Sequence, residues 1–212
     1  MKHHPMLYSA PMVRALLDGT KTQTRRTAKL TGGGHVKETG GHRRWHPGDP
    51  NAVQACPYGH PGDHIWVRET FFAFGRWETR FSAKKGRDEW HFVDMTLECG
   101  RAYGYDEPHG FSLAKRRRSG AAPTWHRRPA IFMPRAASRI TLEITGVRVE
   151  RLQDIGRGDA MAEGCPFPNM VQGSDPRRWY AELWEQLNGP GSGEANPWVW
   201  VVEFKRVTGG AA

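Results

Sequence analysis

The sequence has few cysteines: only Cys56, Cys99 and Cys165 among its 212 residues. An odd, sparse set argues against the disulfide framework of a small secreted domain, and it points to a reducing compartment. No apolar run approaches the length of a membrane-spanning helix, and the opening Met-Lys-His-His-Pro lacks the apolar core of a signal peptide. We therefore expect a cytoplasmic protein that has no membrane partner.

Acidic residues are also scarce relative to basic ones, with 22 Asp and Glu against 31 Lys and Arg. The resulting net charge of +9 favours a polyanionic partner such as RNA, or a ligand that carries phosphate. Because the charge is spread along the chain, an ordinary basic, solvated surface explains it equally well. The length fits one domain with elaborations, and it is sufficient to bury a core without disulfides.

The stretch from Gly19 to Arg26, Gly-Thr-Lys-Thr-Gln-Thr-Arg-Arg, concentrates reactive side chains at a structural junction. A short helix is predicted over residues 11–18, because a proline opens it and a glycine follows it. The alternation after the helix indicates the start of a strand, so Lys21 and Thr24 meet only if the chain bends between them. Such junctions often hold functional sites. The alternative is a solvated basic turn.

The spacing of apolar and polar residues in the rest of the chain predicts a mixed α+β fold. Gly146 interrupts an alternating run and is expected to form a bulge or a bend that changes which face is buried. The expected strands lie near residues 64–72, 131–134, 139–149 and 198–207, and the expected helices near 11–18, 159–163 and 176–188.

Two segments, about 27–61 and 73–128, have weaker patterns. Cys56 and His60 in the first have the spacing of half a zinc site, but no second pair follows at regular spacing, so an ordinary Cys-Pro turn is the alternative. The second combines scattered aromatic residues with the basic run 115–118. This combination suits single-stranded nucleic acid, although aromatic residues in strands usually form core.

The spacing Gly19-x-Lys21-x-x-Thr24-x-Arg26 resembles the signature of the ASCH family, G-x-K-x-x-E-x-R. This family belongs to the PUA-like superfamily of β-barrels, which is linked to RNA. Thr24 stands where the signature has Glu, and the small bacterial ASCH proteins that hydrolyse N4-acetylcytidine also carry Lys-x-x-Thr there. The Gly-Asp at 62–63 and the Val-Val-Glu-Phe at 201–204 resemble other parts of the family pattern.

The resemblance implies a single α+β domain over residues 1–212. Its core is a PUA-like (ASCH) mixed β-barrel with short flanking helices, and the segments 27–61 and 73–128 are insertions. The small hydrolases have no counterpart of these insertions. No cofactor and no metal are implied.

The resemblance also implies that Lys21, Thr24 and Glu163 are catalytic. A threonine hydroxyl is a poor nucleophile until a base takes its proton, and a desolvated lysine with a lowered pKa can do so. Arg26, the last signature residue, is expected to bind substrate and to help lower that pKa. Glu163 is expected at a helix C-terminus, where the helix dipole suits it to donate a proton to the leaving amine.

Arg68 and Glu69 lie toward the far end of the strand predicted near 64–72 and are further candidates for substrate binding. Successive residues of a strand project to opposite faces, so at most one of the two faces a pocket. The alternative is that they form ion pairs at the surface.

The sequence is therefore compatible with two alternative functions. The first is an amidohydrolase that acts on N4-acylated cytidine or a related nucleoside amide. The second is a non-catalytic RNA-binding ASCH module, or a weak ribonuclease, in which Lys21 and Arg26 contact phosphates. The threonine in place of glutamate favours the enzyme, whereas the net charge favours RNA binding.

Overall fold

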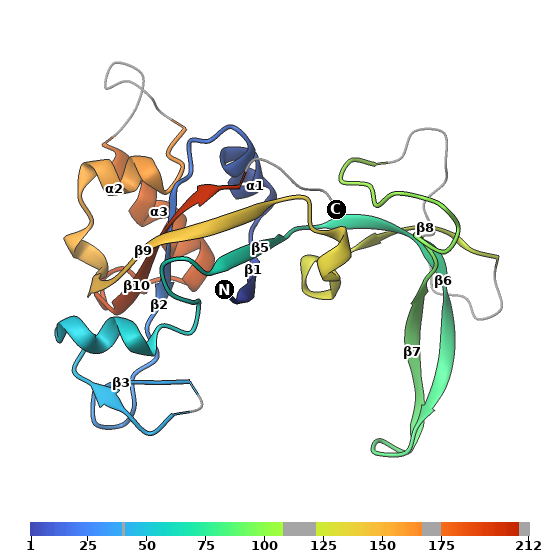
Figure 1. Cartoon of the computed structure of the whole chain (residues 1–212), viewed down its shortest axis with the longest axis horizontal. Helices are drawn as coiled ribbons and strands as arrows, with labels where there is room; N and C mark the ends of the chain where they lie inside the picture. The colour runs from blue at the N-terminus through green and yellow to red at the C-terminus, as the bar shows by residue number, and fades with distance from the viewer. Residues whose placement is uncertain (40, 108–121, 167–174, 208–212) are drawn as a thin grey trace. The chain divides into compact units, whose positions relative to one another are not determined.

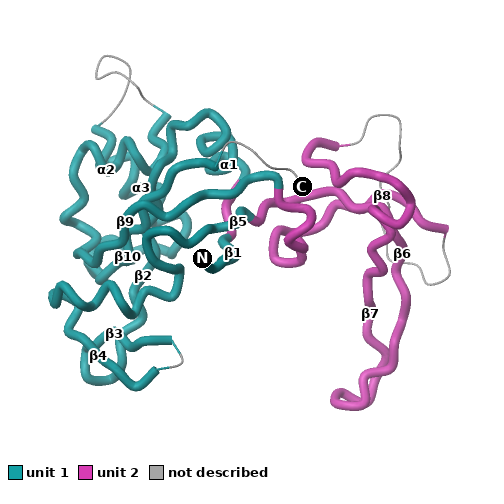
Figure 2. Tube along the Cα trace, viewed as in Figure 1, with its two compact units in different colours: residues 1–6, 10–67, 139–212 teal, residues 7–9, 68–138 magenta. Residues whose placement is uncertain are grey.

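The computed structural model describes residues 1–39, 41–107, 122–166 and 175–207. The chain divides into two compact units (Figure 2): unit 1 comprises residues 1–6, 10–67 and 139–212, and unit 2 comprises residues 7–9 and 68–138. The basic run at residues 115–118, a candidate for contact with nucleic acid, lies outside the described residues. None of the described helices is long and apolar enough to cross a membrane.

Unit 1 is built on a five-stranded sheet with the strand order β1-β5-β9-β10-β2 (Figure 1). The strands are β1 (His3–Leu7), β2 (Gln23–Thr27), β5 (His64–Arg68), β9 (Thr141–Arg151) and β10 (Trp198–Arg206). β10 is antiparallel to both β2 and β9, and β9 is antiparallel to β5. The predicted mixed α+β class is confirmed. Over the described residues the sheet is open, with β1 and β2 at its edges, instead of closing into the expected barrel.

Three α-helices, α1 (Ala10–Leu17), α2 (Arg157–Ala162) and α3 (Pro176–Asn188), confirm the helices predicted in unit 1. α3 begins where expected because the Asp175 side chain accepts a hydrogen bond from the Arg177 backbone N–H at 3.0 Å. Its buried side packs on the sheet, since Tyr180 and Trp184 share a core cluster with Val199 of β10. Helices α2 and α3 thereby cover one face of β10.

The predicted bulge at Gly146 is confirmed. Glu203 of β10 pairs with Gly146, but the next residue, Phe204, pairs with Ile144, so β9 has one extra residue there. A Cβ atom at position 146 would lie 2.7 Å from Glu203 Oε2. Glycine therefore lets the Glu203 side chain lie directly over β9.

Unit 2 contains a three-stranded antiparallel sheet in the order β7-β6-β8. Its strands are β6 (Phe71–Ser82), β7 (Arg87–Asp94) and β8 (Thr124–Arg128). The single strand predicted near 64–72 is in fact two, because β5 ends at Arg68 and β6 begins at Phe71.

The strand predicted near 131–134 is wrong: residues Ala130–Phe132 form the 3-10 helix η2. Pro129 is its N-cap, and Pro134 is the N-cap of the next 3-10 helix, η3 (Arg135–Ala137). Proline has no N–H to donate to a sheet, and two such residues five positions apart leave too little chain for a paired strand.

The first predicted insertion, residues 27–61, belongs to unit 1 and is largely irregular, as expected. It contains the short strands β3 (Val36–Lys37) and β4 (Arg44–Trp45), which pair with each other, and the 3-10 helix η1 (Pro50–Ala55).

Candidate functional site

The loop between α1 and β2 places Lys21 beside the end of α2. Gly19 ends α1 in the left-handed region (φ +75°), and the Lys21 backbone N–H then donates to the Ala15 carbonyl at 3.1 Å. Lys21 forms an antiparallel β-bridge with Glu163, the C-cap of α2. The backbone N–H of Thr22 also donates to Ala162 at 2.8 Å. Backbone contacts on both sides thus fix Lys21 opposite Glu163.

The side chains of Lys21 and Glu163 form a buried ion pair. Lys21 Nζ donates to Glu163 Oε2 at 2.7 Å and to the Glu163 carbonyl oxygen at 2.8 Å. The two side chains are only 2% and 3% exposed. Burial lowers the pKa of Lys21 below its ordinary value; the Glu163 carboxylate opposes this shift, and the nearby positive charges of Arg26 and Arg25 add to it. The predicted lowering of the Lys21 pKa by Arg26 is thereby supported.

Arg25 is the second cation at Glu163, although we did not predict it as a site residue. Its side chain is 0% exposed, and its Nη1 donates to Glu163 Oε1 at 3.2 Å. Its Nη2 donates to Glu150 Oε1 at 2.6 Å and lies 3.5 Å from Asp159 Oδ2. Both oxygens of the Glu163 carboxylate therefore have a cationic partner. The sequence did contain a signal for Arg25. Side chains two or four residues apart in an extended chain point to the same face, and Arg25 is four residues after Lys21.

The ionic network continues from Arg25 towards the surface of unit 1. Arg148 on β9 donates to Glu150 Oε2 at 2.8 Å, to Asp159 Oδ1 at 2.8 Å and also to Glu203. The Arg148 side chain is 34% exposed. The Lys21–Glu163 pair is thus the buried end of a network of alternating charges.

Thr24 and Arg26 lie on the other face of β2, since they alternate with Gln23 and Arg25 along the strand. Thr24 is 1% exposed, and its Oγ1 accepts a hydrogen bond from Arg26 Nη1 at 3.1 Å. The structure therefore brings together Lys21 with Glu163 and Thr24 with Arg26. Among the hydrogen bonds of the described residues, none joins the Thr24 hydroxyl to Lys21 Nζ or to the Glu163 carboxylate.

Arg68 and Glu69, the other two candidates, belong to unit 2, whereas the four residues above belong to unit 1. Arg68 Nη2 donates to the carbonyl oxygen of Ile131. Glu69 is 6% exposed, and its backbone N–H donates to the sulfur of Met133 at 3.3 Å. Both residues thus contact the segment of 3-10 helices around residues 130–137.

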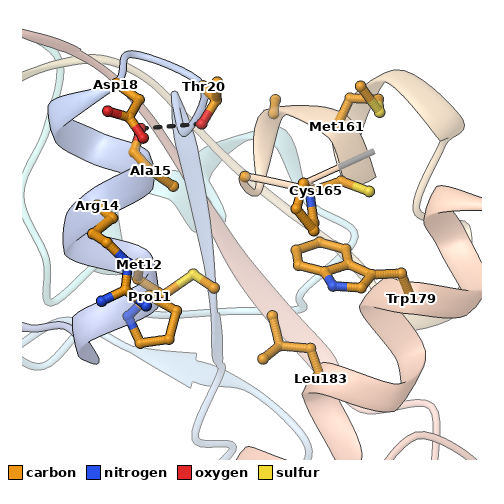
Figure 3. Close-up of a pocket in the computed structure, with 13 residues that line it drawn as sticks. Pro11, Met12, Arg14, Ala15, Asp18, Thr20, Met161, Cys165, Trp179 and Leu183 are labelled. Carbon is orange, nitrogen blue, oxygen red and sulfur yellow. Dashed lines mark hydrogen bonds between the residues drawn. The ribbon is translucent and has the colours of Figure 1, made fainter. Parts of the chain in front are cut away.

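A cleft of about 760 Å³ lies between α1 on one side and α2 and α3 on the other (Figure 3). Its lining includes Thr20, Ala162 and Gly164, which flank Lys21 and Glu163 in the sequence. Gly164 has φ +94°, and a Cβ atom there would lie 3.2 Å from Lys21 Cβ. The backbone beside the ion pair therefore forms part of the cleft, while the ion pair itself is covered.

Cys56, half of the hypothetical zinc pair, is buried at the end of η1. Burial raises the pKa of its thiol to about 11. Metals bind the thiolate, so this shift works against coordination at neutral pH. Within the described ranges, no three or more His, Cys, Asp or Glu residues are grouped so that they could hold a metal ion.

Comparisons with protein-family models, with curated proteins and with solved structures found no match to this chain.

Proposed function

We propose that the protein is an amidohydrolase of the PUA-like ASCH type that acts on N4-acylated cytidine or a related nucleoside amide. The observation that carries the proposal is the buried pair of Lys21 Nζ and Glu163 Oε2 at 2.7 Å. Removing two charges from water costs several kcal/mol per ion, and buried ion pairs contribute little net stability. A buried lysine with a lowered pKa beside a specific carboxylate is typical of a functional site.

In the proposed reaction, Thr24 Oγ attacks the acyl carbonyl carbon and Lys21, in its neutral form, takes the hydroxyl proton. The 2.7 Å hydrogen bond then offers a path for that proton from Nζ to the Glu163 carboxylate. Glu163 gives it to the N4 nitrogen as the C–N bond breaks, because an amide nitrogen leaves poorly as an anion. Water finally hydrolyses the ester on Thr24, which restores the hydroxyl and releases the acid.

Arg26 has a defined role in this scheme. Its Nη1 already donates to Thr24 Oγ1, so its charge would stabilise the oxygen as the proton leaves. In the absence of substrate, Thr24 Oγ1 is bonded to Arg26 and not to Lys21. The scheme therefore requires Lys21 Nζ and Thr24 Oγ1 to come within hydrogen-bond distance when substrate binds, as catalytic contacts often tighten only in the complex.

The direct test is to incubate the purified protein with a panel of N4-acylcytidines and to follow the ultraviolet spectrum of the base. We expect conversion to cytidine and the free acid. Lys21→Arg should reduce the rate about 100- to 10,000-fold, because a guanidinium keeps its proton at any working pH. A wild-type protein that leaves every member of the panel intact overturns the proposal.

The second candidate function, RNA binding without catalysis, is favoured by the net charge of +9. It is not supported at Lys21, whose side chain is 2% exposed and bonded to Glu163 instead of being available to a phosphate. A salt titration of RNA binding separates the two functions. A protein that tracks phosphates should lose affinity steeply as salt rises, with a slope that counts the phosphates contacted.

A further inference from the structure

The two-stranded ribbon formed by β3 and β4 presents two positive charges to solvent. In its register, Val36 lies opposite Trp45. The neighbouring pair is Lys37 and Arg44. Successive residues of a strand point to opposite faces; Val36 is 1% exposed, whereas Lys37 and Arg44 are both exposed. Both strands pack against η1. The ribbon, which lies at the lower end of unit 1 in Figure 2, therefore keeps its apolar pair on the covered side and its two cations on the outer side.

The two outward cations of the ribbon repel each other and lack a counter-charge. Like charges directly opposite each other on paired strands are destabilising. Residues 28–48 contain four lysines and arginines but a single acidic residue, Glu38. The Glu38 carboxylate lies 3.9 Å from Arg43. Among the ion pairs of the described residues, none includes Lys37 or Arg44. An anionic ligand that contacts both side chains would remove this repulsion.

Two exposed cations elsewhere in unit 1 show the contrast. Arg178 on α3 lies 3.2 Å from Glu182, and the two residues are one helical turn apart. Lys205 on β10 lies 3.1 Å from Glu143 on the neighbouring strand β9. The lack of a carboxylate partner is therefore a feature of the ribbon and not of every basic residue on the surface of unit 1.

We propose that the β3–β4 ribbon binds the phosphate backbone of a nucleic acid, with Lys37 and Arg44 each contacting a phosphate. Lysine and arginine side chains bind phosphate oxygens without reading the base sequence. A nucleic acid suits the ribbon better than an anionic membrane does, because the apolar pair is on the covered side and leaves the ribbon no apolar group to enter a bilayer. The inference is independent of the proposed amidohydrolase, since neither residue belongs to that site.

The test measures how binding to two fluorescently labelled probes depends on salt. The probes are a single-stranded RNA of about 20 nucleotides and a DNA duplex of about 20 base pairs, and fluorescence anisotropy gives the binding constant at each salt concentration. The ribbon variant combines Lys37→Gln with Arg44→Gln. The matched control combines Arg178→Gln with Lys205→Gln. Each double variant removes two exposed positive charges, so both lower the net charge of +9 by the same amount.

We expect the logarithm of the binding constant of the wild type to fall linearly with the logarithm of the salt concentration. In the ribbon variant this slope should become shallower by about 1.4 with the RNA or about 1.8 with the duplex, because each lost phosphate contact removes about 0.7 or 0.9 from it. The control should keep the wild-type slope. The probe that shows the change identifies the kind of nucleic acid.

The melting temperature of the ribbon variant should be no lower than that of the wild type, because the substitutions remove the repulsion between the two cations. A ribbon variant that unfolds contradicts this repulsion and overturns the proposal. Equal slopes in the two double variants, or no binding of either probe at low salt, also overturn it. Binding to vesicles that contain phosphatidylserine, without binding to either nucleic acid, assigns the ribbon to a membrane instead.

Discussion

Lys21 Nζ donates a 2.7 Å hydrogen bond to Glu163 Oε2, although the two residues are 142 positions apart in the chain. The backbone bridge between them fixes this contact, and burial keeps it out of water.

The pH dependence of catalysis should report the lowered pKa of Lys21. The scheme needs a neutral amine, so kcat/KM should rise with pH and level off above the folded-state pKa, with a midpoint below the ordinary value of 10.5. Over the window between these two values the unfolded chain binds more protons than the folded one, so stability should also rise with pH. Lys205→Met, at a side chain that is 64% exposed, should keep the kinetic profile. A profile without a basic limb contradicts the role of Lys21.

Replacing the Thr24 hydroxyl should separate nucleophilic attack by threonine from direct attack by water. Thr24→Val keeps the shape of this buried side chain but removes the nucleophile, so turnover should fall to background. Thr24→Ser keeps a hydroxyl and should retain measurable turnover. Stopped assays of both variants on the same N4-acylcytidine are sufficient. Near wild-type activity in Thr24→Val would instead assign the attack to water.

Arg25→Met should destabilise unit 1, because it leaves Glu163 Oε1 and Glu150 Oε1 without the buried guanidinium that they share. Breaking a buried ion pair on one side typically costs about 3 to 5 kcal/mol, which denaturant unfolding measures directly. The matched control is Arg178→Met, which removes an exposed i,i+4 pair with Glu182 and should change stability by no more than experimental error. Equal stability of the two variants contradicts the structural role of Arg25.

Gly164→Ala should damage both stability and catalysis. Its φ of +94° strains any side chain, and the new Cβ would lie 3.0 Å from Ala15 Cβ and 3.2 Å from Lys21 Cβ. Gly62→Ala is the control for backbone strain, because Gly62 has a similar φ of +88° with no atom within 4 Å of the added Cβ. Both variants should lose about 1 to 2 kcal/mol from the strained conformation. Only Gly164→Ala should also lower kcat, because only there does the added Cβ press against Lys21. An equal loss of kcat in both variants would show that this contact with Lys21 does not affect catalysis.

Cys56 and Cys99 should differ in how readily their thiols are alkylated. With a pKa of about 11, about one Cys56 thiol in a thousand is ionised at pH 8, and the side chain is buried. Cys99 is exposed. Iodoacetamide under native conditions should therefore label Cys99 and spare Cys56, and mass spectrometry of peptides gives the site. Labelling in denaturant should reach both residues, and rapid native labelling of Cys56 contradicts its burial.

Several local features could be predicted from the sequence because nearby residues determine them. The apolar run of β10, the opening of α3 at Pro176 and the bulge at Gly146 each depend on a few neighbouring side chains. The strand predicted at 131–134 was wrong for the same kind of reason. Its apolar residues suggested a strand, but the prolines on both sides decided the backbone conformation.

The sequence alone determined the site less completely. The spacing Gly19-x-Lys21-x-x-Thr24-x-Arg26 indicated Lys21, and the resemblance to a known family indicated Glu163 on the short helix. The tertiary structure brought these two residues together. Only the tertiary structure showed that Arg25 is the other cation at Glu163 and that Thr24 lies on the opposite face of β2. The physical reason is that a charge is buried only where distant segments supply its partners. The partners of Arg25 come from β9 and the end of α2, more than a hundred residues further along the chain. The spacing of Lys21 and Arg25 therefore indicated a shared face, but not which carboxylates Arg25 meets there.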